Sequence, residues 1–448
     1  MEDGSGVGNR VRYDLVAYDS TGRERPDSAG TASERLSARL ERVPPTDVFV
    51  ISHGWFGDVP AARRQYDAWV RAMEECPVDR AAAEDRPGGF RPAVVGVHWP
   101  SLPWGSEDFD SSYAVAAGDA AAPGDSVDVG VARIVDSAAA VLADTPVVRA
   151  SVRAIVDSAL DDPVPASLPR GVREAYDRLD AELGLGTAGE GAPPGDDRAP
   201  FDPEAVYQAC LMEELASFGG TSFGGVLAPL RVLSFWQMKR RARVVGASGV
   251  ATLVGRLQRA APEARFHLMG HSFGCIVVSA AVTSAGSAGA SAVSSLALVQ
   301  GAMSLWSFCS AIPSAPERAG SFHRVIANGL VEGPVVVTTS VYDRAVRTFY
   351  PLGASSRGQV DYPSDGLPTY GAIGTFGVRG PGIPISDGNL RSVEDPYDLQ
   401  LGVVYNLRGD DVIRDGSGLM GAHSDIAKPP VAHAVWQAAL ASRPHATR

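Results

Sequence analysis

The chain has 448 residues, of which 45% are hydrophobic and 21% are charged, and its net charge is −12. This length allows one large hydrophobic core together with an insertion. An acidic chain whose main basic cluster is Lys239-Arg240-Arg241, within a helical run, is not typical of nucleic-acid-binding proteins. No apolar stretch reaches the roughly 18 residues of a transmembrane helix. We therefore expect neither a nucleic-acid partner nor stable insertion into a membrane.

The cysteines and the first residues bear on the cellular compartment. Cys76, Cys210, Cys275 and Cys309 lie far apart and form no Cys-x-x-Cys pair, which favours a reducing compartment, although four cysteines could form two disulfides. The opening residues Met-Glu-Asp-Gly-Ser lack the basic and apolar regions of a signal peptide. We therefore expect a cytoplasmic protein.

Strands and helices alternate along two parts of the sequence. In the first part, strands are expected at 11–18, 47–51 and 93–98, and helices at 33–42 and 61–74. In the second part, helices are expected at 230–245, 250–260, 275–282 and 431–440, and strands at 266–269, 334–340 and 401–405. This alternation predicts an α/β core formed by residues 1–100 and 230–448.

Residues 101–229 interrupt this alternation and are predicted to form a largely helical insertion. The helical candidates are 127–142, 147–160, 172–185 and 203–217. Residues 186–200, rich in Gly, Pro, Ala and Asp, have the composition of a linker. A second irregular stretch, 352–398, is also rich in Gly and Pro.

The most informative stretch is Gly270-His271-Ser272-Phe273-Gly274, which lies between a predicted strand and a predicted helix. A serine on a sharp strand-to-helix turn has a strained backbone, and the two glycines leave space where the chain folds back on itself. The N-terminus of the helix would direct backbone N–H groups toward an oxyanion formed at Ser272. We interpret Ser272 as a nucleophile. The alternative is an ordinary glycine-rich turn.

A second loop, His53-Gly54-Trp55, follows the buried strand predicted at 47–51. A strand that ends in His-Gly far upstream of the serine resembles the oxyanion loop of α/β-hydrolases. That resemblance implies that the backbone N–H groups of Trp55 and Phe273 bind the oxyanion together. The alternative is a glycine-containing turn whose aromatic side chains belong to the core.

A serine nucleophile needs an imidazole that accepts its proton. Four histidines lie downstream of the serine motif: His323, His423, His433 and His445. In α/β-hydrolases the acid comes before the histidine, and His323 precedes the acid proposed below. His433 lies within a predicted helix, and His445 lies in a polar tail. His423 follows a predicted strand and a glycine-rich loop, so we predict that His423 is the general base.

The acid of such a site orients the histidine. The most β-like run between the serine motif and His423 is 334–340, and Asp343 follows it by three residues. We predict that Asp343 is this acid. The rivals Asp361, Asp365 and Asp387 lie in a Gly/Pro-rich stretch without a predicted strand before them. The alternative roles of Asp343 are to cap a helix or to pair with Arg344 or Arg347.

The chain as a whole resembles the α/β-hydrolases, and in particular uncharacterised bacterial members that share three motifs. These are the His-Gly-Trp loop, the Gly-His-Ser-x-Gly motif, and a terminal Gly-x-His-Ser-Asp segment, here 421–425. The resemblance covers about residues 10–100 and 230–440. It implies the α/β-hydrolase fold, with a mostly parallel twisted sheet flanked by helices, and a triad of Ser272, His423 and Asp343. It implies no particular substrate, since many chemistries share this scaffold.

The resemblance also suggests what surrounds the triad. A helical insertion in this fold commonly covers the pocket as a lid, and peripheral decoration is the alternative. Five residues near the ends of the predicted strands are candidates for lining a pocket: His53, Gly54, His98, Trp99 and His271. The histidines match no metal-ligand spacing, so we expect no metal and no cofactor.

We therefore expect a serine hydrolase that cleaves carboxylic esters or related acyl compounds through an acyl-enzyme on Ser272. The partner would be a small-molecule acyl substrate. Three alternatives remain open: an acyltransferase with the same triad, an amidase or peptidase, and a non-catalytic binding protein that has kept the fold. The sequence gives no oligomeric state.

Overall fold

The computed structural model describes residues 13–55, 58–101, 127–185, 200–216, 225–349, 366–416 and 420–442. Within these residues, eight strands form one sheet in the order β1-β3-β2-β4-β5-β6-β8-β7. Every pair of neighbouring strands is parallel. The strands are β1 (Tyr13–Ala17), β2 (Asp47–Ser52), β3 (Pro92–His98), β4 (Arg265–His271), β5 (Ser295–Val299), β6 (Val335–Thr339), β7 (Ile385–Asn389) and β8 (Val404–Arg408). The predicted α/β class and parallel sheet are confirmed.

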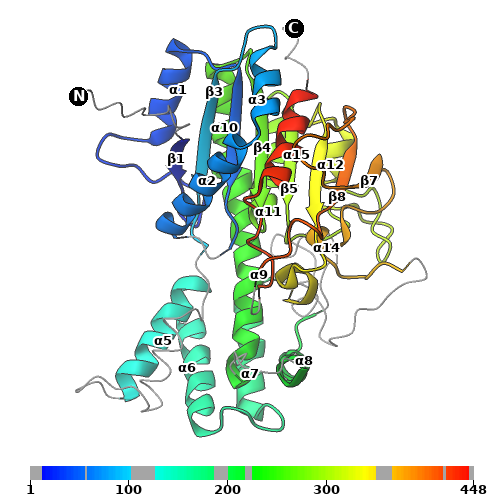
Figure 1. Ribbon diagram of the computed structural model, residues 1–448. Helices are drawn as coiled ribbons and strands as arrows, with labels where there is room; N and C mark the ends of the chain where they lie inside the picture. Colours follow the sequence, from blue (N-terminus) through cyan, green and yellow to red (C-terminus); the bar gives the residue numbers. More distant parts are fainter. Residues whose placement is uncertain are drawn as a thin grey trace, which may run out of the picture.

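Helices cover both faces of the sheet (Figure 1). One face carries α2 (Val59–Glu74), α3 (Pro77–Glu84) and α15 (Pro429–Leu440), and the other carries α1 (Ala32–Arg42), α10 (Ala251–Ala260) and α11 (Gly274–Ser287). Because both faces are covered, every residue of β2 and β4 is buried. Alternate residues of β2 enter two different cores: Val48 packs on the α11 side, and Phe49 on the α2 and α15 side.

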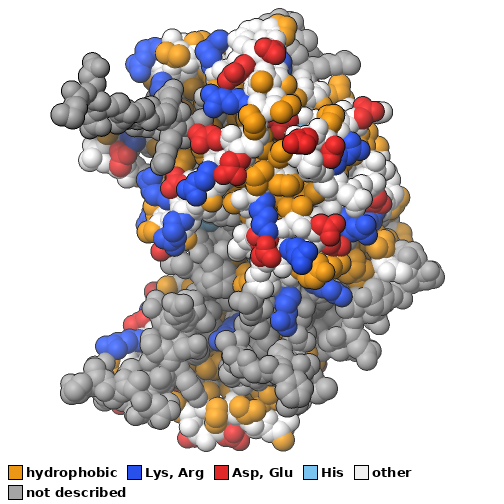
Figure 2. All heavy atoms as spheres, viewed as in Figure 1, with side chains coloured by type: hydrophobic (Ala, Val, Ile, Leu, Met, Phe, Trp, Pro, Cys, Tyr) orange, Lys and Arg blue, Asp and Glu red, His pale blue; other side chains and the backbone are white. Residues whose placement is uncertain are grey.

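The surface over α2, α3 and α15 carries both charged and hydrophobic side chains (Figure 2). Acidic and basic side chains are interspersed over these helices, and hydrophobic side chains gather between α2 and α15 (Figure 2). Among the described residues, no helix is both long enough and apolar enough to cross a membrane.

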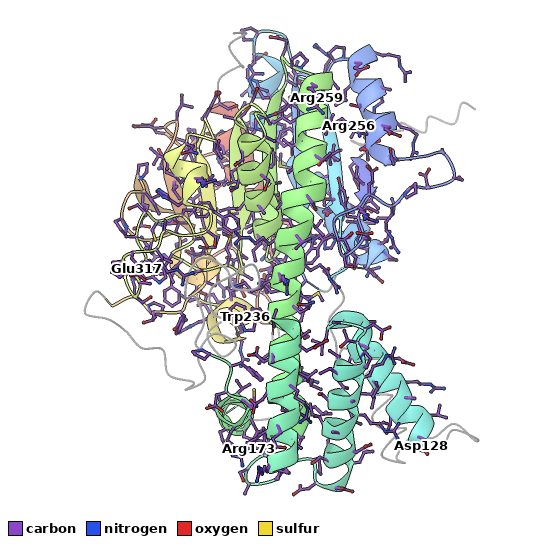
Figure 3. The ribbon with its side chains drawn as sticks, turned by 180° about the vertical axis from the view of Figure 1, so that it is seen from behind. Asp128, Arg173, Trp236, Arg256, Arg259 and Glu317 are labelled. Atoms are coloured by element: carbon purple, nitrogen blue, oxygen red, sulfur yellow. The ribbon has the colours of Figure 1, made fainter. Side chains whose placement is uncertain are left out.

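A continuous helical run connects the insertion to the sheet (Figure 3). It consists of α9 (Ala228–Val245), a π-helical turn η2 (Gly246–Val250) and α10. At about 1.5 Å per residue, the run is roughly 50 Å long. The run packs closely against α11 at the π turn. A Cβ atom at Gly246 would lie 2.3 Å from the carbonyl oxygen of Val277. The run therefore fixes the insertion to one face of the sheet.

Within the described residues of the insertion, four α-helices pack beside the lower half of α9 (Figure 1). They are α5 (Val127–Val141), α6 (Pro146–Asp161), α7 (Arg170–Leu183) and α8 (Pro203–Ala216), as the sequence predicts. Their buried side chains, such as Val152 and Leu179, belong to the same hydrophobic cluster as Trp236 of α9. Residues 186–199 of the predicted linker lie outside the described part of the chain.

Two strands in the second half of the sheet, β5 and β7, were not predicted from the sequence. β7 lies within the stretch 352–398 that was expected to be irregular. This strand has the sequence Ile-Ser-Asp-Gly-Asn, lies at the edge of the sheet and is mostly exposed, so it lacks a hydrophobic pattern. The strand predicted at 401–405 begins at Val404 and ends at Arg408. The described part of the core also contains the short helices α12 (His323–Ala327), η3 (Ala345–Phe349) and α14 (Ile373–Phe376).

Candidate active site

Ser272 occupies the turn between β4 and α11. Its φ angle is +56°, and among the described residues only Gln300 is another non-glycine residue with positive φ. A side chain in this region costs about 1–3 kcal/mol, which the surroundings must offset. A Cβ atom at Gly270 would lie 2.3 Å from the carbonyl oxygen of Gly274, and one at Gly274 would lie 2.3 Å from that of Ser52. Glycine is therefore required at both positions for the chain to turn so sharply.

The serine hydroxyl begins a chain of hydrogen bonds through two other side chains. The Nε2 atom of His423 lies 2.8 Å from Oγ of Ser272, and its Nδ1 atom lies 2.8 Å from Oδ2 of Asp343. Because a carboxylate accepts hydrogen bonds, Nδ1 of His423 carries the proton and Nε2 is free to accept the proton of Ser272. All three side chains are buried. The structure thus brings together the three residues that the sequence assigned to a triad.

Two loops place Asp343 beside His423. Asp343 follows β6, and its Oδ1 atom also accepts the backbone N–H of Val346 at 3.2 Å, so it caps the short helical turn η3 as well. The N–H of Ala422 donates to the carbonyl of Tyr342 at 3.0 Å. A Cβ atom at Gly421, where φ is +54°, would lie 2.5 Å from that carbonyl oxygen. Glycine at 421 therefore allows the two loops to approach each other.

The loop after β2 packs directly against the serine. A Cβ atom at Gly54 would lie 2.5 Å from the Cβ of Ser272, so only glycine fits at this contact. Trp55 follows Gly54, and Phe273 precedes the first residue of α11. Their rings lie 5.9 Å apart. The two residues predicted to supply oxyanion N–H groups thus come from loops that meet at Ser272.

Two buried histidines support the His53-Gly54 loop. The Nδ1 atom of His53 donates to the carbonyl of Gly54 at 2.8 Å, and its Nε2 atom accepts from Nδ1 of His98 at 3.2 Å. The ring of His53 also stacks on Trp99, with centroids 5.6 Å apart. Burial lowers the pKa of His53 to about 3 and, with nearby Arg25, that of His98 to about 4. Both are therefore neutral at physiological pH. The role of these residues in lining a pocket stays a prediction.

Three aromatic side chains contact one another at the loops that meet at Ser272. Phe235 of α9 lies 4.9 Å from Phe273 and 5.7 Å from Trp55 between ring centroids. Ser272 is only 3% exposed. No sequence signal indicates Phe235, because it lies in an ordinary helical run and has no motif around it.

The rival residues have other partners. His433 lies in α15 and pairs with Asp79 of α3, and Asp387 pairs with Arg379. The Nδ1 atom of His323 lies 3.3 Å from the carbonyl oxygen of Phe308. Asp361, Asp365 and His445 lie outside the described residues. Across the described ranges, no group of three or more His, Cys, Asp or Glu side chains could hold a metal ion.

No family model, no curated protein and no solved structure matches this chain in the comparisons.

Proposed function

We propose that this protein is a serine hydrolase of the α/β-hydrolase type that cleaves carboxylic esters or related acyl compounds. One observation carries the proposal: a buried hydrogen-bonded chain from Ser272 through His423 to Asp343 starts at a positive-φ turn. A histidine aligned in this way can accept the serine proton as the hydroxyl attacks a carbonyl carbon.

The reaction would proceed in two steps. In the first, Oγ of Ser272 bonds to the acyl carbon, His423 accepts the hydroxyl proton, and the carbonyl becomes an oxyanion beside the N–H groups of Trp55 and Phe273. His423 then transfers its proton to the leaving alkoxide, which departs as an alcohol. In the second step, water attacks the acyl carbon while His423 accepts its proton, and His423 then transfers that proton to Oγ of Ser272 as the bond between Oγ and the acyl carbon breaks, which releases the acid and free Ser272. Asp343 stabilises the imidazolium in both steps.

We propose further that residues 101–229, with the first half of α9, form a cap over the carboxyl edge of the sheet, which is the side where the carboxyl ends of the parallel strands lie. Two contacts support this arrangement. Phe235 reaches the loops that carry Trp55 and Phe273. The half-buried guanidinium of Arg241 donates to the carbonyls of Pro100 and Val141 at 3.2 and 3.0 Å, so it joins the segment after β3 to α5. Apart from the first half of α9, residues 1–100 and 230–448 would be the catalytic core.

We also propose that the protein acts in the cytoplasm. Its cysteines are all free and buried in the structure. This arrangement fits a reducing compartment, where a structural disulfide would be rare.

A panel of p-nitrophenyl esters, with acetate to dodecanoate as the acyl group, tests the proposal. We expect burst release of p-nitrophenol followed by steady turnover, because these activated esters should acylate Ser272 faster than water hydrolyses the acyl-enzyme. Addition of an alcohol or amine acceptor, with measurement of the product ratio, distinguishes hydrolysis from acyl transfer. Cleavage of p-nitroanilides but not of esters would indicate an amidase. Failure to turn over any acyl compound would favour a non-catalytic binding protein.

A further inference from the structure

His271, the residue before Ser272, lies between two hydrogen-bonding partners. Its Nε2 atom lies 2.9 Å from the backbone carbonyl oxygen of His423, and its Nδ1 atom lies 2.8 Å from Nε2 of Gln65 in α2. The carbonyl oxygen can only accept, so Nε2 of His271 carries the proton. The Nδ1 atom then has a lone pair and accepts from the Gln65 amide. One arrangement of protons therefore satisfies both contacts.

The surroundings of His271 keep it uncharged. Burial, together with the neighbouring His423, lowers the pKa of His271 well below its usual value. The two imidazole rings are only 4.8 Å apart. A charged His271 would oppose the imidazolium that His423 must become when it accepts the serine proton. A neutral His271 holds the backbone of His423 without this repulsion.

The helix that supplies Gln65 also supports the other half of the site. The next residue, Tyr66, accepts the backbone N–H of His53 at its hydroxyl oxygen, at 2.9 Å. The same hydroxyl donates to the carbonyl of Val97 at the end of β3. Adjacent residues of α2 thus contact the oxyanion loop and, through His271, the loop that carries His423.

We propose that Gln65 and His271 are positioning residues that fix the backbone of His423, and so hold its imidazole in line with Ser272. Gln65 acts by selecting the tautomer of His271 that donates to the His423 carbonyl. This inference rests on the proposed function of Ser272 and His423. Displacing a base by about 1 Å can cost a hundredfold in rate, so weakening this support should lower the rate of the serine attack.

The substitutions Gln65→Glu and Gln65→Leu separate positioning from simple packing. The introduced glutamate has nearly the same shape as glutamine, but when ionised it can only accept. It would draw the proton of His271 to Nδ1 and leave a lone pair on Nε2 facing the His423 carbonyl. Leucine neither donates nor accepts a hydrogen bond, so Gln65→Leu favours neither tautomer of His271. We expect Gln65→Glu to slow labelling by a fluorophosphonate about tenfold or more at pH 8, and Gln65→Leu to slow it by about threefold or less.

The pH dependence gives a second readout that a purely structural role would not produce. As the pH falls toward the ordinary glutamate pKa of about 4.3, the introduced carboxyl group gains a proton that it can donate to Nδ1 of His271. The ratio of the wild-type labelling rate to that of Gln65→Glu should therefore decrease as the pH is lowered. In ester turnover, kcat should fall while KM changes by less than about threefold. Gln208→Leu is the matched control, since Gln208 donates to Ala166 and Glu204 within the insertion.

Variants of His271 test the donor itself. His271→Phe removes the donor while keeping a planar ring, and we expect labelling to slow by about 10- to 100-fold. His271→Gln restores an N–H donor at a similar distance from the backbone and should recover part of the rate. Circular dichroism and thermal melting establish which variants fold.

The labelling rates of these variants decide whether Gln65 and His271 have a positioning role. If wild-type protein reacts with the fluorophosphonate but Gln65→Glu matches it at every pH, the positioning role is wrong. The same holds if a folded His271→Phe matches the wild type, or if folded His271→Gln is no better than folded His271→Phe. If His271→Phe does not fold, the two Gln65 variants decide the question. If wild-type protein itself does not react, the proposed function fails rather than this inference.

Discussion

Two groups of serine, histidine and aspartate lie along the sheet. One is at the carboxyl ends of the strands (the carboxyl edge), and the other is toward their amino ends (the amino edge). Ser272, His423 and Asp343 lie at the carboxyl edge. At the amino edge, Nδ1 of His267 lies 2.9 Å from Oγ of Ser295, and its Nε2 lies 3.2 Å from Oδ1 of Asp47. Both groups are buried and have similar hydrogen-bond lengths. Residue types and distances alone therefore do not identify a catalytic group.

The surroundings of the two serines differ. Ser295 is the first residue of β5, and its backbone belongs to a parallel strand. Ser272 has a positive φ angle, lies before the first turn of α11 and is packed against Gly54. Only Ser272 is therefore placed where backbone N–H groups of a helix N-terminus and a neighbouring loop could bind an oxyanion.

The surroundings of the two aspartates differ as well. Asp47 accepts two hydrogen bonds from Arg86, at 2.8 and 2.9 Å, and Arg265 lies 4.0 Å away. Although burial would raise it, the contacts with His267, Thr46 and Arg86 lower the pKa of Asp47 to about 2. This carboxylate neutralises buried arginines, whereas Asp343 contacts a histidine and a backbone N–H. We interpret the amino-edge group as a stabilising ion cluster.

The largest difference should appear when each serine is removed. Ser272→Ala should lower kcat for ester hydrolysis by about 10⁴-fold or more, because the members of a triad act as a unit. Ser295→Ala should leave kcat within about twofold. His423→Ala should be about as damaging as Ser272→Ala. Equal losses in the two serine variants would remove the distinction between the two groups.

Removing each carboxylate should produce opposite phenotypes. Asp343→Asn should slow turnover by about 10³- to 10⁴-fold, because an amide can donate toward Nδ1 of His423 and favour the wrong tautomer. Asp47→Asn should change kcat little but lower the free energy of unfolding by about 3 kcal/mol, because buried arginines lose their counter-charge. Urea unfolding followed by fluorescence, together with ester kinetics, measures both quantities. A stable but inactive Asp47→Asn protein would contradict this assignment.

The amino-edge group around Asp47 should also make the free energy of unfolding depend on pH. Its folded-state pKa of about 2 is below the ordinary value of 3.8, so the contribution is present at neutral pH and is lost as the pH falls toward 2. A shift of this size corresponds to about 2 kcal/mol. The stability difference between wild type and Asp47→Asn should therefore shrink between pH 5 and pH 3. A difference that is constant over this range would exclude the proposed charge pairing.

The smallest expected effect concerns His433, a third buried histidine with a carboxylate partner. Burial lowers its pKa, but Asp79 at 2.6 Å and the carbonyl of Asp395 outweigh burial, so the pKa of His433 is raised. Its stabilising contribution should be complete below pH 6.5 and be lost as the pH rises through the folded-state pKa. His433→Gln should accordingly lose its stability deficit on going from pH 6 to pH 9, while ester turnover stays within about tenfold of wild type. Loss of turnover would instead place His433 in the site.

The sequence predicted the carboxyl-edge group because its members obey a simple rule of topology. Ser272, Asp343 and His423 each lie in a loop after a predicted strand, and the carboxyl ends of parallel strands meet at one edge. The glycines around Ser272 gave an additional local signal. The helical insertion was also predictable, because its apolar residues recur with a helical period.

The supporting residues were not predictable by the same reasoning. Gln65, Tyr66 and Phe235 lie within ordinary amphipathic or buried helices, and their contacts depend on how those helices pack. Asp47, His267 and Ser295 lie on β2, β4 and β5, far apart in the sequence, and no motif brings them together. β7 was missed because its exposed residues give no hydrophobic pattern.

Mapping the site of fluorophosphonate modification tests the central distinction most directly. Wild-type protein would be treated with the reagent, digested and sequenced by tandem mass spectrometry. We predict one modified residue, Ser272, with no label on Ser295, and no labelling of the Ser272→Ala protein. Modification of Ser295, or persistent labelling of Ser272→Ala, would contradict the assignment of the carboxyl-edge group as the catalytic site.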